Sequence, residues 1–501
     1  MRAAHTVEAV RSAEHALMAT VPDGALMQRA AAGLAATCAR LLDHVYGSRV
    51  VVLAGSGDNG GDALYAGARL AGRGADVVAV AASRQLHQGG AAELCGRGGR
   101  VIEAGGEQNI AAPAARAIAA ADLIIDGLTG IGGHGGLREP TGSLARLTES
   151  ARADGALVVA ADLPSGIDAD SGESPGTAIQ ADVTVTFGTI KPGLLIDPGA
   201  SHAGTVELID IGLGRYLADP VAVALQAADV AAILPRPDAE SDKYRRGVLG
   251  LLAGSEQYTG ALVLACGGAI HAGAGMVRAV SAAPAIGVVR QYWPEVVLTT
   301  YDPALAADAV GSAGRVQAWT AGPGMGTGGT ARDLLARVLA SDVPVLIDAD
   351  GLTVLAEDRD LLPRAAPTLI TPHAGELARL LGADRADIEA RRLHFVRTAA
   401  AELGITVLLK GSTTVIARPD GSLPVLVNST GSNWLATAGS GDVLSGLAGG
   451  LLAQGVDPAH AAAAAAYLHG IAARLAARDA PIGASELIGA IPAAIRTVKN
   501  L

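Results

Sequence analysis

Two clusters of glycine and acidic residues have the composition of sites that bind phosphate and move protons. The first, GSGDNGGD at 55–62, follows the apolar run RVVVLA at 49–54. The second, AGSGDVLSG at 438–446, leads into small residues expected to form a helix over 444–452. Glycine permits positive φ and close approach of a ligand to the backbone, and the free N–H groups at a helix start attract anions. Each run therefore predicts a phosphate-binding turn between a strand and a helix. The alternative for the first run is a tight structural turn with Asn and Asp in left-handed positions.

The carboxyl group in the second run has two possible roles. Asp442 in a first helical turn can accept the proton of an attacking hydroxyl, while the preceding glycine amides stabilise a developing phosphoryl charge. It can equally stabilise its own helix through the helix dipole. Strand-end motifs nearby favour the first role. KGSTT at 410–414 offers a cation and hydroxyls for nucleotide phosphates, and His373 starts a helix after another strand. DAD at 348–350 is more typical of an acidic turn than of a metal site.

Two further loops follow expected strands in the first half of the chain, DGLTGIGG at 126–133 and ADLPSGID at 161–168. In open parallel sheets, ligands bind beyond the carboxyl ends of the strands, where such loops converge. Asn59, Asp126 and Ser165 there offer oxygen ligands to a hard cation. Asp162 offers an acid or base, although Asp-Leu-Pro-Ser-Gly is also typical of a turn. Spacing alone leaves both interpretations of Asp162 open.

The elements that must position these loops are short apolar strands alternating with helices rich in Ala and Leu. Continuous rather than alternating hydrophobicity, as in DLIID at 122–126 and ALVVAA at 156–161, indicates strands buried on both faces. A second such series follows at 248–253, 315–320, 343–347, 367–371 and 406–409. The sequence therefore predicts an α/β protein of two three-layer α/β/α domains. The mixed-charge, proline-containing stretch between the series predicts domains at 1–215 and 241–501 with a linker at 216–240.

Composition limits the classes of partner. Half of the 501 residues are hydrophobic, which excludes a disordered chain, and the net charge of −11 argues against a nucleic-acid or anionic-membrane surface. The widely spaced Cys38, Cys95 and Cys266 form no zinc or disulfide pattern and suit a reducing cytosol. The N-terminus lacks the apolar segment of a signal peptide, and no apolar run is long enough to cross a membrane. We expect a cytoplasmic protein.

The first half resembles a known family through four motifs in order: GSGDNGGD, DGLTGIG, ADLPSGIDADSG and TFGTIKPG (186–193). Nearly all of 1–215 is similar to the NAD(P)H-hydrate epimerase domain, which implies a Rossmann-like fold and K⁺ held by Asn59, Asp126 and Ser165. The resemblance implies that the hydrated dinucleotide contacts Asp162 and two loops, namely Asp58, Asn59, Gly60, Gly61, Asp62, Gly130, Ile131, Gly132, Gly133, His134, Gly135 and Gly136. Asp58 replaces a usual Asn, which would weaken attraction for a phosphate, and Thr129 replaces a common Phe.

The second half resembles the ADP-dependent NAD(P)H-hydrate dehydratase domain, a relative of ribokinase-like small-molecule kinases, over about 225–501. The shared motifs include GPGMG at 322–326, TPHAGE at 371–376, KGSTT and GSGD. The resemblance implies hydrate contacts at Ala261, Gly324, His373 and Asp442. It implies adenine-nucleotide contacts at Lys410, Gly411, Ser412, Thr413, Thr414 and Gly441. Ser440 replaces a frequent Thr, and Trp434 and Ala438 depart from the usual glycine-rich approach to this loop.

Together the two resemblances imply a metabolite repair enzyme. It would interconvert the R and S hydrates of NADH and NADPH (NADHX and NADPHX), with Asp162 moving the proton. It would then dehydrate the S form with ADP and Mg²⁺, with Asp442 as the base. The rival interpretation is a ribokinase-like small-molecule kinase whose N-terminal half is a non-catalytic nucleotide-binding module. We expect small-molecule substrates, a homo-oligomer, and neither a nucleic-acid nor a membrane partner.

Overall fold

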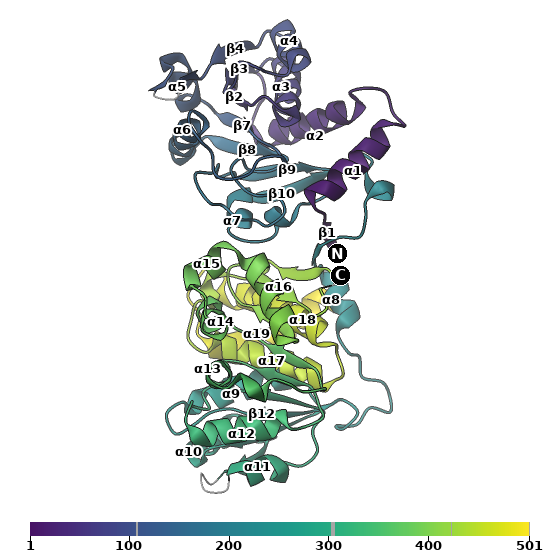
Figure 1. The fold of residues 1–501 in the computed structure, drawn as a ribbon, viewed down its shortest axis with the longest axis vertical. Helices are drawn as coiled ribbons and strands as arrows, with labels where there is room; N and C mark the ends of the chain where they lie inside the picture. Colours follow the sequence, from purple (N-terminus) through teal and green to yellow (C-terminus); the bar gives the residue numbers. More distant parts are fainter. Residues whose placement is uncertain (107–108, 302–305, 422, 500–501) are drawn as a thin grey trace. The chain divides into compact units, whose positions relative to one another are not determined.

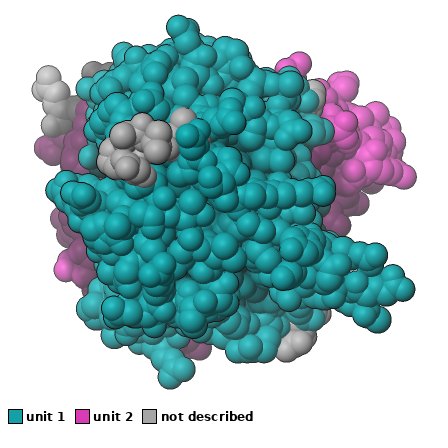
Figure 2. Space-filling model, turned by 90° about the horizontal axis from the view of Figure 1, so that it is seen from below, with its two compact units in different colours: residues 1–2, 223–501 teal, residues 3–222 magenta. Residues whose placement is uncertain are grey.

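The computed structural model describes residues 1–106, 109–301, 306–421 and 423–499. The chain divides into two compact units, one of residues 3–222 and one of residues 1–2 with 223–501 (Figure 2). The segment 216–240, which the sequence predicts as a linker, contains strand β11 (Ala222–Ala224) and helix α8 (Ala227–Ile233). With 7 residues, α8 is too short to show helical periodicity in the sequence. Its N-terminus is held by a capping box between Gln226 and Asp229.

The unit of residues 3–222 is built on a parallel sheet in the order β10-β9-β8-β7-β2-β3-β4 (Figure 1). Its strands are β2 (Arg49–Ala54), β3 (Asp76–Ala81), β4 (Arg100–Glu103), β7 (Leu123–Gly127), β8 (Leu157–Ala161), β9 (Val183–Phe187) and β10 (Thr205–Ile209). The strand order reverses between β2 and β7, which is the Rossmann-like arrangement, and ligands bind at such a reversal. The buried central strands agree with the continuous hydrophobicity of the sequence.

Helices cover both faces of this sheet. Helices α2, α3 and α4 pack together on one face, and α5 and α6 on the other (Figure 1). The helices are α1 (Val7–Met18), α2 (Ala25–Leu41), α3 (Asp58–Ala71), α4 (Gln88–Gly96), α5 (Ala112–Ala119), α6 (Thr141–Ala153) and α7 (Gly199–Ala203). Strand β5 (Gly105–Gly106) pairs antiparallel with β6 (Asn109–Ile110). Each face has its own apolar core, so the sheet is the middle of three layers.

The other unit is built on a sheet in the order β1-β11-β20-β19-β18-β17-β16-β15-β12-β13-β14. Besides β11, its strands are β1 (Arg2–Ala4), β12 (Val248–Leu252), β13 (Met276–Ser281), β14 (Val297–Thr300), β15 (Ala318–Ala321), β16 (Val345–Ile347), β17 (Thr368–Ile370), β18 (Thr406–Leu409), β19 (Thr414–Ala417) and β20 (Val425–Asn428). The pairs from β14 to β18 are parallel, and β19 pairs antiparallel with β18 and β20. The order reverses at β12, between β13 and β15.

Helices α9, α17 and α18 cover one face of this sheet, and α12 and α16 the other. The helices are α9 (Thr259–His271), α10 (Ala283–Tyr292), α11 (Ala306–Ser312), α12 (Gly329–Leu339), α13 (Asp350–Glu357), α14 (Ala374–Leu381), α15 (Arg385–Ala390), α16 (Arg392–Leu403), α17 (Ser440–Ala453), α18 (Pro458–Ala477) and α19 (Ala484–Lys499). In the described parts of the chain, no helix combines the length and apolar character needed to span a membrane.

Small residues bring α9 and α17 into backbone contact. A methyl group added at Gly446 would lie 2.0 Å from the carbonyl oxygen of Ala265, and one added at Gly268 would lie 2.3 Å from that of Val443. Only glycine fits at these positions, because a Cβ atom cannot approach a carbonyl oxygen so closely. Helix α17 begins at Ser440 rather than at 444, since the left-handed Gly439 (φ 85°) turns the chain into it. Asp442 therefore lies in its first turn, as predicted.

Candidate active sites

The end of β8 places Asp162 among three hydrogen-bond donors. Asp162 has a φ of 63°, in the left-handed region that residues other than glycine seldom adopt. Its Oδ1 atom accepts hydrogen bonds from Lys191 Nζ, from Thr186 Oγ1 at 3.1 Å and from Phe187 N at 3.2 Å. The Lys191 side chain is 1% exposed. No described residue donates to Oδ2, so one oxygen is fixed and the other is left for a ligand.

Asp162 lines a cavity of about 490 Å³ at the reversal of strand order. The cavity brings together the predicted site residues Asp58, Asn59, Asp62, Gly130, Ile131, Gly132, Gly133 and Asp162, and adds Arg11 and Glu14 from α1. Gly60 instead packs inside the turn, where a methyl group would lie 2.4 Å from the carbonyl oxygen of Gly55. His134 is exposed and its Nδ1 lies 3.2 Å from Asp168 Oδ2. Gly61, Gly135 and Gly136 are likewise outside the lining.

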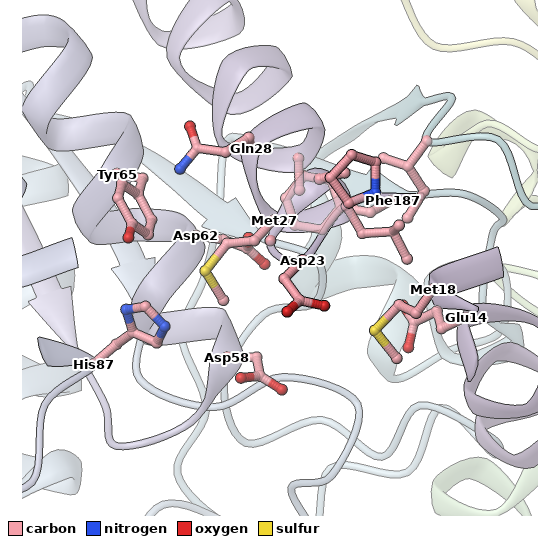
Figure 3. A pocket seen from close by; sticks show the side chains of 16 residues that line it. Glu14, Met18, Asp23, Met27, Gln28, Asp58, Asp62, Tyr65, His87 and Phe187 are labelled. Carbon is pink, nitrogen blue, oxygen red and sulfur yellow. The ribbon is translucent and has the colours of Figure 1, made fainter. Parts of the chain in front are cut away.

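Carboxyl groups from α1 and from the start of α3 line the same cavities (Figure 3). Burial, together with the nearby charges of Asp162, Asp58 and Glu14, raises the pKa of Asp62 well above its usual value. The Oδ1 atom of Asp62 is buried and has no hydrogen-bond partner. Burial, followed by the charge of Asp162, also raises the pKa of Glu14. Asp62 is therefore a neutral acid at pH values where an exposed aspartate would be ionised.

The three predicted cation ligands form one hydrogen-bonded cluster. Asp126 is fully buried, and its Oδ1 accepts a hydrogen bond from Ser165 Oγ at 2.7 Å. Asn59 Nδ2 donates to the carbonyl oxygen of Thr129 at 2.8 Å, and that oxygen lies 3.2 Å from Ser165 Oγ. The Asn59 Oδ1 atom is buried without a partner. Burial raises the pKa of Asp126 to about 6, against hydrogen bonds from Ser165 that lower it. An oxygen-rich cluster with an unpartnered amide oxygen suits a hard cation.

The second unit places Asp442 beside a buried ion pair. Lys410 Nζ lies 2.7 Å from Asp348 Oδ1 and 3.7 Å from Glu376 Oε2. The Ser445 hydroxyl, one turn after Asp442 in α17, donates a hydrogen bond to Asp348 Oδ2. Asp348 is 1% exposed, so both of its oxygens are committed to partners in the core of the site. Lys410 is thus paired with Asp348 rather than with Asp442.

This pairing leaves Asp442 poised to exchange a proton. Burial raises the pKa of Asp442 to about 7, and the charge of Asp348 adds to the rise while Lys410 opposes it. Burial lowers the pKa of Lys410, but the charges of Asp348 and Glu376 outweigh it and raise the pKa overall. A methyl group at Gly441 would lie 3.7 Å from Lys410 Nζ. A phosphate contacting Gly441 would therefore meet the ammonium group directly.

The remaining predicted residues of this unit fall into two groups. Gly324 and Ala261 lie together, since a methyl group at Gly324 would be 2.8 Å from the Cβ atom of Ala261. His373 is an exposed N-cap of α14, and its Nδ1 accepts hydrogen bonds from Gly375 N and Glu376 N. The motif at 410–414 is less open than predicted. Thr413 and Thr414 are buried, the Arg392 guanidinium packs against Gly411, and Ser412 is exposed.

Side chains of these sites to which the sequence interpretation gave no role include Arg11, Glu14, Lys191 and Glu376. Lys191 lies in the TFGTIKPG motif just after β9, so its strand-end position was a usable signal. Asp348 was noted as an acidic turn, but nothing in the sequence pairs it with Lys410. Glu14 comes from a helix far along the chain from the glycine loops, and no sequence pattern signals that contact.

These folds and sites define a two-domain α/β enzyme with carboxyl groups and a lysine at the ligand-binding edge of the sheet in each domain. The profile described as YjeF-related protein N-terminus matches residues 23–193, and that described as NAD(P)H-hydrate dehydratase matches 249–492. The bifunctional NAD(P)H-hydrate repair enzyme of Mycobacterium leprae is 46% identical over 506 residues, covering 99% of both chains. That of Moorella thermoacetica is 36% identical, covering 91% of this chain and 89% of its own. The chain belongs to the family of bifunctional NAD(P)H-hydrate repair enzymes.

A solved structure supports the fold of the second unit. The chain is similar to a ribokinase-like superfamily protein of Enterococcus faecalis with a TM-score of 0.50 and 25% identity, covering 57% of this chain and 99% of that one. The predicted family, the α/β fold class with its ribokinase-like half and the predicted class of bifunctional repair enzyme are therefore confirmed.

Proposed function

We propose that the unit of residues 3–222 epimerises NAD(P)H hydrates at Asp162, and that the second unit dehydrates the S epimer with ADP at Asp442. The observation that carries the proposal is a carboxyl group close to a lysine in each unit. Asp162 is buried and contacts Lys191, while the half-buried Asp442 lies near Lys410 at the start of α17. Asp162 and Lys410 directly follow β8 and β18, at the carboxyl ends of these strands. Ligand crevices of open parallel sheets lie at these ends. The positions agree with the motifs that the relatives' family implies for both activities.

Epimerisation requires only proton transfer and reversible loss of hydroxide. The hydrated ring carries a hydroxyl on C6, beside the ring nitrogen, so the departure of hydroxide leaves an iminium ion stabilised by that nitrogen. The free Oδ2 of Asp162 would carry the proton to and from the departing oxygen. Lys191 acts through Asp162, because it holds Oδ1 and thereby the orientation of the carboxyl group. Water returning to the opposite face gives the other epimer.

K⁺ fits the cluster of Asn59, Asp126 and Ser165, whose donors are all oxygens. The unpartnered Oδ1 of Asn59 and the buried carboxyl group of Asp126 are the observations that favour it. When bound, the ion would supply a fixed positive charge that orders the loop at 129–133. That order positions the substrate; the proton transfer itself belongs to Asp162.

Dehydration must convert hydroxide, a poor leaving group, into a better one. Asp442 would accept the proton of the C6 hydroxyl, whose oxygen then attacks the terminal phosphorus of ADP and releases AMP. The phosphate formed on C6 departs with the C6–O electron pair, helped by the ring nitrogen, and loss of a proton from C5 forms the C5–C6 double bond of NAD(P)H. The atoms balance without a redox cofactor.

Lys410 and the start of α17 suit the phosphates of the nucleotide. Gly439 turns the chain so that the first amides of α17 have no side-chain cap, and Gly441 leaves room beside the Lys410 ammonium group. No group of three or more His, Cys, Asp and Glu side chains that could hold a metal ion occurs among the described residues. Mg²⁺ would therefore enter on the nucleotide phosphates, as is usual for this ion, and would neutralise their charge.

The test is a pair of assays on the full chain. The S hydrate with ADP should recover the absorbance of NAD(P)H, and the pure R hydrate should do so only while the epimerase is active. Asp162→Asn should stop recovery from R but not from S. A stable phosphorylated product, or recovery from R in Asp162→Asn at the normal rate, would contradict the proposal in favour of the kinase alternative.

A homo-oligomer and a cytoplasmic location stay predictions of the sequence. Sedimentation of the purified chain tests the first, and fractionation of cells tests the second. Preference between NADHX and NADPHX, and between ADP and ATP, is read from the same assays with each substrate pair.

A further inference from the structure

A second cavity adjoins the one that Asp162 lines. It has a volume of about 350 Å³ and lies between α1, α2, α3 and the start of α4 (Figure 3). The two cavities share the side chains of Glu14, Asp58, Asp62 and Phe187. They are therefore adjoining chambers that meet at the start of α3.

The lining of the second chamber suits a flat aromatic group. Tyr65 and His87 meet edge to face with their ring centroids 5.6 Å apart, and Met27 lies beside them (Figure 3). The buried ring of Phe187 and the apolar Leu26 complete the wall. Aromatic rings and thioethers of this kind bind planar ligands by stacking and by edge contacts.

Polar groups in the second chamber include both hydrogen-bond donors and hydrogen-bond acceptors. The His87 Nδ1 atom accepts from Gly90 N at 3.0 Å, which places the proton of the neutral ring on Nε2 as a donor. Gln28 Oε1 is occupied by Arg69, so its amide nitrogen remains a donor. The carboxylate of Asp23 accepts. An aromatic base with ring nitrogens and an exocyclic amine matches this set.

We propose that the second chamber binds the adenine of the dinucleotide hydrate while the first holds its hydrated nicotinamide ring. This inference rests on the proposed epimerase function. The diphosphate would cross at the start of α3, where Gly57 leaves the first amides without a side-chain cap. The phosphates have no basic partner in the second chamber, whose lining holds no lysine or arginine, whereas Arg11 lines the first.

The experiment compares two substrates that differ only in the adenylate half. Epimerisation is followed for the hydrate of NADH and for the hydrate of reduced nicotinamide mononucleotide, with wild type, Tyr65→Ala and Gln28→Ala. Tyr46→Ala is the matched control, since Tyr46 is an exposed tyrosine of the same unit that lines neither chamber. In the wild type, we expect a KM at least tenfold higher for the mononucleotide hydrate.

The ratio of the two KM values is the decisive quantity. Tyr65→Ala should reduce it about three- to tenfold, in keeping with the strength of an aromatic contact, with kcat preserved. Tyr46→Ala should leave it unchanged. Equal KM values in the wild type, or a Tyr65→Ala effect of the same size on both substrates, would overturn the inference.

A binding measurement keeps the inference separate from the proposed activity. If neither substrate is epimerised by the wild type, the proposed function fails, and adenosine binding by NMR still tests the chamber. Contacts from adenosine protons to the rings of Tyr65 and His87 would support it. Adenosine signals identical in wild type, Tyr65→Ala and Gln28→Ala would contradict it, even if one variant lost stability.

Discussion

The two candidate active sites contain the same residue types in different pairings. In the first unit, Lys191 contacts Asp162, the proposed catalytic carboxyl group itself. In the second, Lys410 contacts Asp348, and Asp442 lies beside that pair without an ion-pair partner among the described residues. The first lysine therefore fixes the orientation of its acid, whereas the second leaves its acid free to exchange a proton.

The difference follows the chemistry each site has to perform. Epimerisation returns the proton to the substrate, so it needs an acid with a fixed geometry. Phosphoryl transfer needs a base that is ready to take a proton near neutral pH, and burial next to Asp348 raises the pKa of Asp442 to about 7. On the proposed assignments, the residue with which each lysine pairs is the feature that distinguishes the two carboxyl groups.

Replacing each carboxyl group should produce the largest losses of rate, and each replacement should affect only one of the two reactions. Asp162→Asn should slow R-to-S conversion by roughly 10²–10⁴-fold, and Asp442→Asn should slow NAD(P)H recovery from S by a similar factor, because each variant loses an acid–base group. Chirally resolved chromatography and absorbance measure the two rates. Each variant serves as the control for the other, and a loss of both activities in either one would contradict the separation of the sites.

Replacing each lysine should lower the free energy of unfolding, by a different amount in the two units. Lys191→Met leaves Asp162 without its ion-pair partner in a buried site, which typically costs about 3–5 kcal/mol of unfolding free energy. Lys410→Met should cost more. Asp348 then keeps one hydrogen-bond donor, Ser445, beside the carboxyl group of Glu376, whereas Asp162 in Lys191→Met keeps the donors Thr186 and Phe187. Urea unfolding followed by probes in each unit measures both. Equal losses in the two variants would show that the pairing does not distinguish the sites.

The pH profile of dehydration should report Asp442. A base with a pKa of about 7 is protonated and inactive at pH 5, so the rate should rise with pH through about 7 and then level. Asp348→Asn removes a like charge and frees Lys410, which should move the midpoint to lower pH by roughly one unit. Steady-state rates on the S hydrate from pH 5 to 9 measure it, with Asp162→Asn as the control. A profile unchanged in Asp348→Asn would count against this assignment.

Potassium should stabilise the first unit by a few degrees, and in a pH-dependent way. Burial raises the pKa of Asp126 from its usual 3.8 to about 6, so the buried carboxyl group costs stability as pH rises from about 4 to about 6, and a bound cation relieves that cost. The rise in Tm on adding KCl should therefore be larger at pH 8 than at pH 5. Calorimetry with tetramethylammonium chloride controls for ionic strength. A rise of the same size in Asp126→Asn would exclude this site.

The smallest effect is expected at Asp58, which stands where the family usually has Asn. Asp58→Asn removes a negative charge at the start of α3, where a substrate phosphate would lie. The KM for epimerisation should fall about two- to fivefold at low salt, and the gain should shrink as salt rises. Initial rates at two ionic strengths measure it. A KM that rises would mean that Asp58 instead donates or accepts a needed hydrogen bond.

The sequence predicts the parts of the molecule that are local in the chain. The strands and the glycine loops at 55–62 and 438–446 follow from contiguous runs, and so does the position of Asp442 in a first turn. The pairings of Lys191 with Asp162 and of Lys410 with Asp348 join segments 29 and 62 residues apart, so they depend on strand order and side-chain direction. Burial hides Thr413 and Thr414 for the same reason, since a motif does not reveal which of its side chains the sheet encloses.

Helix α17, which carries Asp442, packs directly against the backbone of α9 through contacts between glycines and carbonyl oxygens. No layer of side chains separates the two backbones there, so any added atom must translate the whole of α17. A single methyl group at Gly446 or Gly268 would shift the carboxyl group of Asp442 away from the substrate hydroxyl. The methyl group itself would contact neither the hydrate nor the nucleotide. Substitutions at these two buried glycines should therefore reduce dehydratase activity, although neither glycine is among the residues proposed to contact a ligand.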